Sequence, residues 1–230
     1  MKNIIITGAS KGIGYATALH FAKKEHKVYA LARSSEHLND LKKEAYSGEI
    51  IPVSIDLTSQ SEVEAFLTKL TENLEIDVLV NNAGALINKP FMESDISDWM
   101  FQLDVNLLAP VRLIKALKNR FSSGSHIVNI SSMGGFQGSS KFPGLAAYSA
   151  SKGALSILTE CLSTEFASDK IAVNCLCLGA VQTEMLNEAF PGYEAPTKPE
   201  EMGSFIADFS LKAHSFINGK IIPVALNNPG

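Results

Sequence analysis

Two residues that could exchange a proton with a ligand stand four positions apart in the segment AAYSASKGAL, residues 146–155. If this segment is helical, Tyr148 and Lys152 lie on one face of the helix, one turn apart. The lysine ammonium would favour the phenolate and lower a tyrosine pKa that is ordinarily about 10. Such a tyrosine can give or take a proton near neutral pH. Because the same spacing arises by chance in many helices, the pair needs support from the elements around it.

Short apolar segments alternate with longer segments of helical periodicity along the chain. The apolar segments that predict strands are 3–7, 27–32, 50–56, 76–84, 125–132, 171–179 and 219–226. The periodic segments that predict helices are 12–26, 36–45, 61–74, 97–121, 146–166 and 199–211. This alternation predicts an α/β fold of the Rossmann type, a doubly wound parallel sheet of about seven strands with helices on both faces. Pro52 indicates an early or edge position for the third strand, and residues 184–198 form the loosest segment.

The turn after the first strand, TGASKGIG, contains Gly8, Gly12 and Gly14. Glycine lets the backbone turn tightly and approach a phosphate, and the N-terminus of the following helix attracts an anion. The spacing is G-x-x-x-G-x-G, longer than the usual G-x-G-x-x-G. A plain tight turn is the alternative, but the strand before it and the helix after it favour a dinucleotide site.

The second strand ends without the carboxylate that often binds the ribose 2′-hydroxyl of NAD in such folds. Ala32 is followed by Arg33 instead, and Lys11 lies inside the glycine turn. Two cations would suit a 2′-phosphate, so the sequence predicts NADP(H) rather than NAD(H). The alternative is that both are solvated surface charges.

Three further strands end in polar side chains, at the edge where ligands bind in a sheet of this kind. They are Asp56 in DLT, Asn81 and Asn82 in NNAG, and the serine pair that closes NISS at residue 132. Helix capping by the aspartate and turn formation by the asparagines are the alternative roles.

In this order and spacing, these segments resemble the short-chain dehydrogenase/reductase family in its single-domain form. The resemblance rests on TGASKGIG, DL at 56–57, NNAG, Asn106 in LDVNLLAP, NISS, YSASK and LGAVQT at 178–183. It runs essentially from end to end and implies one domain over residues 1–230, with the substrate site in its C-terminal half. It implies an NADP-dependent oxidoreductase that reduces a ketone or other carbonyl, of which a 3-oxoacyl group is one candidate. A non-catalytic NADP(H)-binding regulator or scaffold on the same fold is the alternative, and a sugar-nucleotide epimerase is disfavoured by its usual glycine spacing.

The resemblance also implies roles for individual residues. Tyr148 would be the general acid/base, Lys152 would lower its pKa and hold the nicotinamide ribose, and Ser132 would hydrogen-bond the substrate oxygen. Asn106 would position a water that relays protons to Lys152. The implied cofactor-binding residues are Gly8, Ser10, Lys11, Gly12, Ile13, Gly14, Arg33, Asp56, Leu57, Asn82, Ala83, Gly84, Tyr148, Lys152, Gly179 and Thr183.

Two departures from the family pattern affect the site. The usual Pro-Gly after the sixth strand is Leu178-Gly179 here, and the loop before Tyr148 is longer than is common. The longer loop makes Ser131 and Ser139 alternatives to Ser132. Aromatic residues of this loop and of the segment after Thr183 would suit an apolar or acyl-type ketone, although packing roles are equally expected.

Composition limits the partners. The formal net charge of −4 provides no basic stripe for nucleic acid, and no stretch approaches the length of an apolar membrane span. The chain has three cysteines, which favours a reducing compartment and the cytoplasm. The five histidines share no metal-ligand spacing, so no metal is expected. From the family resemblance, the helices at 97–121 and 146–166 are expected to pair subunits into a homodimer or homotetramer.

Overall fold

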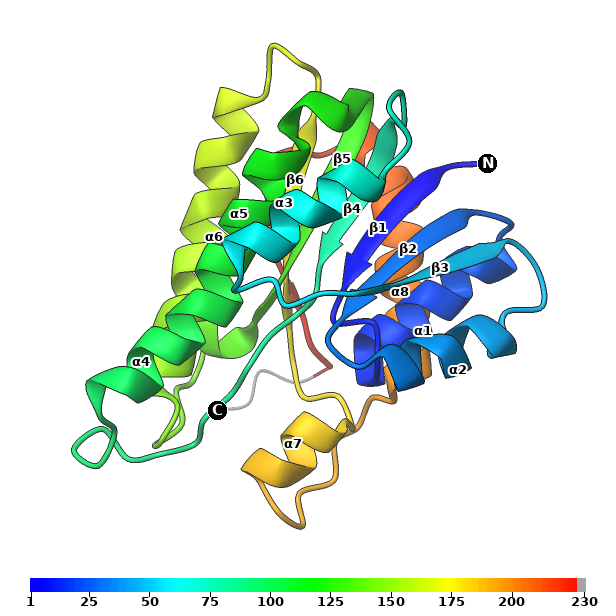
Figure 1. Cartoon of the computed structure of the whole chain (residues 1–230). Coiled ribbons are helices and arrows are strands. Elements are labelled where there is room, and N and C mark those ends of the chain that lie inside the picture. Colours follow the sequence, from blue (N-terminus) through cyan, green and yellow to red (C-terminus); the bar gives the residue numbers. More distant parts are fainter. Residues whose placement is uncertain (227–230) are drawn as a thin grey trace.

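The computed structural model describes residues 1–226, in which seven strands form one parallel sheet with the order β3-β2-β1-β4-β5-β6-β7 (Figure 1). The strands are β1 (Asn3–Thr7), β2 (Lys27–Ala32), β3 (Glu49–Ser54), β4 (Ile76–Asn81), β5 (Phe121–Ser132), β6 (Ala172–Leu178) and β7 (Ile221–Val224). The order reverses between β1 and β4, which is where doubly wound sheets open a ligand crevice. The predicted fold class is confirmed, and Pro52 lies in the edge strand β3.

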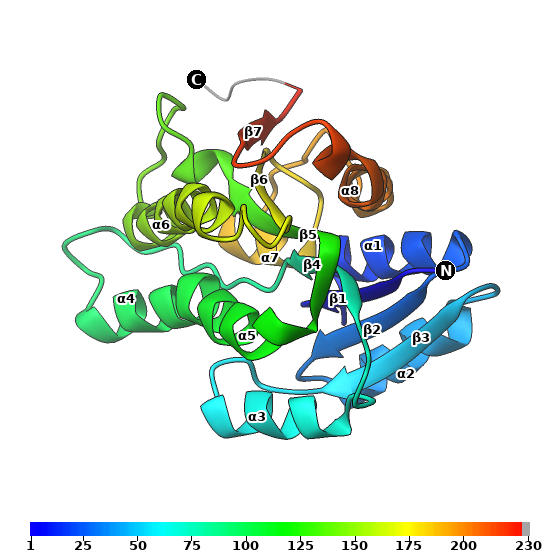
Figure 2. The same cartoon turned by 90° about the horizontal axis from the view of Figure 1, so that it is seen from above.

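Eight α-helices are present among the described residues, and those that flank the sheet form one layer on each face (Figure 2). They are α1 (Gly12–Lys23), α2 (Ser35–Glu44), α3 (Gln60–Lys69), α4 (Ile96–Leu103), α5 (Ala109–Leu117), α6 (Ala146–Glu165), α7 (Glu184–Ala189) and α8 (Pro199–Lys212). Helices α1, α2 and α8 share one apolar core with the sheet, and α3 and α5 share another.

The two cores explain why the strands have near-continuous apolar sequences. In β1, Ile4 and Ile6 pack in the core with α1 and α8, while Ile5 between them packs in the opposite core. Successive side chains of a strand point to opposite faces, so a strand covered on both sides buries every residue.

The predicted long helix at 97–121 is interrupted, which corrects the sequence interpretation. Helix α4 ends at Leu103, a π-helical turn spans Asp104–Leu108, and α5 begins with Pro110 in its first turn. Proline has no N–H to donate to the carbonyl four residues earlier, so the regular ladder cannot continue through it. Strand β5 then begins at Phe121, four residues before the predicted start.

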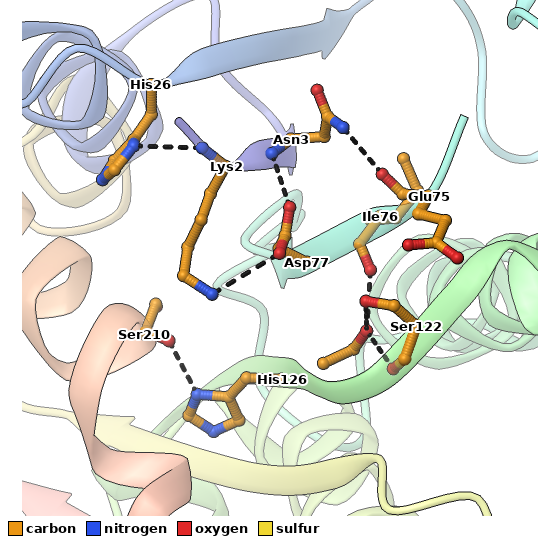
Figure 3. A network of polar contacts seen from close by, with 10 residues as sticks. Lys2, Asn3, His26, Glu75, Ile76, Asp77, Ser122, His126 and Ser210 are labelled. Atoms are coloured by element: carbon orange, nitrogen blue, oxygen red, sulfur yellow. Dashed lines mark hydrogen bonds and ion pairs between the residues drawn. The ribbon is translucent and has the colours of Figure 1, made fainter. Parts of the chain in front are cut away.

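The amino ends of the strands, opposite the ligand edge, contain a polar network (Figure 3). Asp77 accepts from the backbone N–H of Asn3 at 2.8 Å and pairs with Lys2 at 3.4 Å. Nearby, the buried His126 ring lies with Nδ1 2.9 Å from the carbonyl oxygen of Ser210. A carbonyl only accepts, so Nδ1 carries the hydrogen, and Nε2 accepts from Nδ2 of Asn174 at 2.9 Å, which holds the imidazole neutral.

Among the described residues, no helix combines the length and the apolar character that crossing a membrane would require. The same residues contain no cluster of three or more His, Cys, Asp or Glu side chains placed to bind a metal ion.

Candidate active site

The structure brings the sequence-predicted site residues to the carboxyl edge of the sheet or to the helices that follow it. Figure 1 shows this edge at the lower end of the strands, with α7 beyond it. The glycine turn follows β1, Arg33 follows β2, Asp56 and Leu57 follow β3, and the NNAG segment closes β4. Ser132 ends β5, Tyr148 and Lys152 lie in α6, and Gly179 and Thr183 follow β6.

The glycine turn is packed too tightly for side chains. Gly8 and Gly12 have positive φ of 67° and 58°. A Cβ on Gly14 would lie 2.3 Å from the carbonyl oxygen of Gly8 and 2.4 Å from Nδ2 of Asn82. No side chain caps the N-terminus of α1, so the N–H groups of its first turn, at residues 12–14, are available to an anion. This arrangement suits a pyrophosphate.

Thr7 and Asn82 connect the glycine turn to the end of β4. Asn82 donates through Nδ2 to the carbonyl oxygens of Thr7 at 3.0 Å and Gly8 at 3.3 Å. The Thr7 hydroxyl oxygen accepts from the N–H groups of Asn82 and Ala83 at 3.0 and 2.9 Å. Sequence reasoning missed Thr7, because the partners of its hydroxyl lie 73 or more residues away.

Asn81 is a structural residue. Its Nδ2 donates to Oδ1 of Asn129 at 2.8 Å, and Nδ2 of Asn129 donates to the Thr159 hydroxyl at 2.9 Å. All three residues are buried, so this chain of hydrogen bonds ties β4 and β5 to α6.

The two predicted phosphate-binding cations differ in their surroundings. Arg33 is exposed just after β2. Lys11 pairs with Glu184 of α7 at 2.6 Å.

The carboxylate of Asp56 accepts from the N–H of Thr58 at 2.9 Å and from its hydroxyl at 2.7 Å, and these bonds lower the pKa of Asp56. Asp56 is not the cap of α3, because Ser59 caps that helix.

Asn106 lies at the centre of the π-helical turn and is fully buried. Its Oδ1 accepts from the N–H of Ala85 at 2.8 Å. Its Nδ2 donates to the carbonyl of Ala85 and to the hydroxyl of Ser151, both at 2.9 Å. The side chain therefore locks the segment after β4 to α6 and has no donor left over for a ligand.

Lys152 is buried, and its Nζ donates to the carbonyl oxygen of Ile130 at 2.9 Å. Burial lowers the pKa of Lys152 to about 8. A Cβ on Gly84 would lie 3.2 Å from Oδ1 of Asn106 and 3.3 Å from Nζ of Lys152. Gly84, Asn106 and Lys152 thus meet at the end of β4.

Tyr148 is half-buried on the same helix. Burial raises the pKa of Tyr148, and a hydrogen bond with Ser132 partly opposes that rise. The expected lowering of the Tyr148 pKa by Lys152 was therefore wrong for this structure. Nζ of Lys152 lies 6.0 Å from the Tyr148 ring centroid, and burial sets the direction of the Tyr148 pKa.

The three candidate serines have distinct surroundings. Ser131 is buried and donates to the carbonyl of Lys152 at 2.8 Å. Ser139 donates to the carbonyls of Met133 and Phe136 within the long loop. Ser132 accepts from the N–H of Gly134 at 3.1 Å, which leaves its own O–H free to donate beside Tyr148. Of the three, Ser132 is the one placed beside the tyrosine.

Thr183 and Gly179 join the segment after β6 to the site. The Thr183 hydroxyl oxygen accepts from the N–H of Leu186 and so caps α7, within the segment predicted to be loose. A Cβ on Gly12 would lie 3.3 Å from Cγ2 of Thr183. Gly179 donates its N–H to the carbonyl of Val224 at 2.9 Å.

The long loop lines a groove of about 790 Å³ that does not include Tyr148. Phe136, Phe142 and Leu145 line it, together with the α6 residues Ala146, Ser149, Ala150, Gly153 and Ile157. At 3.6 residues per turn, these α6 positions lie on the helix face opposite Tyr148 and Lys152. The loop aromatics therefore contribute to a surface groove away from the reactive pair.

A parallel sheet whose strand order reverses beside a glycine turn, with Tyr148 and Lys152 at its carboxyl edge, defines a dinucleotide-binding α/β protein. The family model described as short chain dehydrogenase matches residues 2–194. The chain therefore belongs to the short-chain dehydrogenase/reductase family, whose members are oxidoreductases that use nicotinamide cofactors.

Known proteins resemble the chain over nearly its whole length. It is 31% identical to 3-oxoacyl-[acyl-carrier-protein] reductase FabG of Thermotoga maritima, covering 97% of this chain and 96% of the relative. It is also 31% identical to meso-2,3-butanediol dehydrogenase of Serratia marcescens, in a match that covers 97% of this chain and 92% of that relative. The solved structure of a 4-hydroxyisoleucine dehydrogenase mutant complexed with NADH and succinate superposes on this chain with a TM-score of 0.87 at 29% identity. The match covers 99% of this chain and 98% of that one.

Proposed function

We propose that the protein is an NADPH-dependent reductase that converts a ketone or other small carbonyl to an alcohol, with Tyr148 as the proton donor. One observation carries this proposal: Tyr148 lies beside Ser132 and one helical turn from Lys152, whose Nζ meets Gly84 and Asn106 at the edge that also presents the glycine turn. A regulator on the same fold would not require this set to be assembled.

The residues present fit a nicotinamide dinucleotide. The uncapped N-terminus of α1 and the crowded glycines leave backbone N–H groups for a pyrophosphate. Gly8, Ser10, Gly12, Ile13 and Gly14 would hold it there. We assign the adenosine half to Arg33, Lys11, Asp56, Leu57 and the segment 82–84, and the nicotinamide half to Tyr148, Lys152, Gly179 and Thr183. When bound, the dinucleotide supplies the hydride.

The protein would contribute positioning and proton transfer. The raised pKa of Tyr148 keeps the phenol protonated at neutral pH, which is the form that donates to a developing alkoxide. Ser132 offers a second O–H to the same oxygen. Lys152, positive at neutral pH, would stabilise the phenolate that remains after the transfer.

Asn106 would support a proton relay through its backbone. Its side chain is bound to Ala85 and Ser151, so it is not the group that holds a water. Pro110, four residues later, has no N–H for the carbonyl of Asn106. That carbonyl is therefore our candidate to hold the water that exchanges protons with Lys152.

NADP(H) is proposed over NAD(H) because Arg33 stands exposed where an acidic residue would favour the ribose hydroxyl. The solved relative with NADH shows that nicotinamide dinucleotides without the phosphate bind in this family. Measuring the affinities for NADPH and NADH decides the point, because equal or reversed affinities would remove the preference.

We further propose a single domain that acts as a homodimer or homotetramer in the cytoplasm, where its three cysteines stay reduced. Phe91, Ile96, Met100 and Ile157 are exposed apolar residues on or beside α4 and α6, which suits pairing between subunits. No nucleic acid or membrane partner is proposed. Light scattering that found only monomer would overturn the assembly.

The function is tested by following NADPH oxidation with a panel of 3-oxoacyl thioesters, diketones and quinones. We expect turnover with at least one apolar or acyl-type ketone. Tight NADPH binding without turnover of any of these carbonyls would instead support the non-catalytic alternative.

A further inference from the structure

Lys11 and Glu184 form an ion pair between the glycine turn and the helix beyond the strand ends. The Lys11 ammonium lies 2.6 Å from a carboxylate oxygen of Glu184, and both side chains are more than half exposed. Lys11 is the N-cap residue of α1, and Glu184 is the first residue of α7. The pair therefore places an acidic group beside one of the two cations that we assign to a 2′-phosphate.

Contacts at both ends of α7 hold this carboxylate in place. Thr183 caps α7 and lies next to Gly12 of the glycine turn. At the other end of α7, Nδ2 of Asn88 donates to the carbonyl of Ala189 at 2.8 Å. Because both ends of α7 are tethered, the proximity of Glu184 to Lys11 is a property of the fold at this edge.

Glu184 also lies within the electrostatic range of the helix that follows Arg33. Its pKa is lowered, first by the hydrogen bond and charge of Lys11 and then by the charge of His37. His37 lies in the first turn of α2. The charge of Glu184 thus interacts with Lys11 in the glycine turn and, more weakly, with the start of α2, the helix that follows Arg33.

We propose that Glu184 is a specificity-determining residue that weakens the binding of NADP(H) relative to NAD(H). The proposal rests on the proposed function, in which the adenosine half of the dinucleotide lies at Lys11 and Arg33. A phosphate with a charge near −2 would compete with Glu184 for the Lys11 ammonium and would be repelled by the carboxylate. A ribose 2′-hydroxyl carries no charge and meets neither penalty.

The test compares the dissociation constants of NADPH and NADH for wild type and Glu184→Gln, measured by titration of nicotinamide fluorescence. Because exposed ion pairs are weak, we expect NADPH to bind about three- to tenfold more tightly to the variant, with NADH changed by less than about twofold. Glu188→Gln is the matched control, since Glu188 is exposed on the same helix and takes no part in the ion pairs found in residues 1–226. It should leave the ratio of the two constants unchanged.

A second comparison isolates the competition for Lys11. In a Lys11→Met background, the gain in NADPH affinity from Glu184→Gln should be smaller than in wild type, because the competition for the shared partner is gone and only the repulsion of the phosphate by the carboxylate remains. A gain of undiminished size in that background would overturn the competition.

The remaining outcomes separate this inference from the function on which it rests. If wild type binds both dinucleotides and Glu184→Gln leaves their ratio unchanged, the inference is wrong and the proposed function stands. If the variant loses NADH affinity, Glu184 binds the ribose hydroxyls and the inference is wrong. If wild type binds neither dinucleotide, both proposals fall.

Discussion

The ammonium nitrogen of Lys152 lies 6.0 Å from the centroid of the Tyr148 ring, one helical turn away and on the same face of α6. Burial acts on both groups in the direction of the neutral form. It raises the pKa of Tyr148 above 10.0 and lowers the pKa of Lys152 to about 8. Between these values the lysine loses its charge while the tyrosine keeps its proton.

This order of ionisation predicts the pH profile of carbonyl reduction. The kcat should be constant from about pH 6 to 7 and fall as pH rises through about 8, because neutral Lys152 no longer stabilises the Tyr148 phenolate. The measurement is kcat at saturating NADPH and substrate across pH 6–10, with circular dichroism to show that the fold persists. A flat profile to pH 10, or one that falls below pH 7, contradicts this assignment.

The serine pair at the end of β5 can be separated by mutation. Ser132→Ala should lower kcat by about two orders of magnitude, because it removes a donor to the developing oxyanion. Ser131→Ala should keep kcat within a few-fold of wild type and instead lower the free energy of unfolding by about 1 kcal/mol, since it removes a buried hydrogen bond to Lys152. Kinetics and urea unfolding of both variants check this prediction. A large loss of kcat in Ser131→Ala, with the loss of stability in Ser132→Ala, would show that the longer loop has moved the catalytic role from Ser132 to Ser131.

The π-helical turn predicts a stability effect at Asn106. Asn106→Ala leaves both backbone groups of Ala85 without their partner and should lower the free energy of unfolding by about 2 kcal/mol. Asn88→Ala removes an exposed hydrogen bond and should cost about 0.5 kcal/mol or less. Urea unfolding of the two variants measures the difference, and equal losses would mean that Asn106 does not hold the turn.

Protein stability should fall in acid partly because of His126. Burial lowers the pKa of His126 to about 4, so between pH 6.5 and 4 the unfolded chain binds a proton that the folded chain does not. Stability therefore rises with pH across this window, and His126 contributes about 3 kcal/mol to the rise. His126→Leu should flatten the dependence of unfolding free energy on pH, while the exposed control His37→Leu should not. An unchanged slope in His126→Leu would show that this histidine is not held neutral.

Much of the fold was predictable because the signals are local. The bounds of β1 and β2 match the predicted segments, and α6 differs by one residue at its end. The break in the helix at 97–121 was not predicted, because α4 and α5 are each periodic and the turn depends on Asn106 reaching Ala85. Pro110 was the local sign of the break.

The site was predictable in position and less so in chemistry. A parallel sheet brings every strand end to one edge, so Asn82, Ser132 and the glycines could be placed without coordinates. The partners of Thr7 and Lys11 could not, since Asn82 and Glu184 lie 75 and 173 residues away. The direction of the Tyr148 pKa was missed because burial is a property of the folded chain.

The central claim is that Tyr148 gives the proton that completes carbonyl reduction. The direct measurement is single-turnover reduction by enzyme with NADPH already bound, comparing Tyr148→Phe with wild type. We expect the variant to bind NADPH within about twofold of wild type and to reduce the carbonyl about a thousandfold more slowly, because general acid catalysis is lost. A variant that binds NADPH and reduces the carbonyl within a few-fold of the wild-type rate would contradict the account.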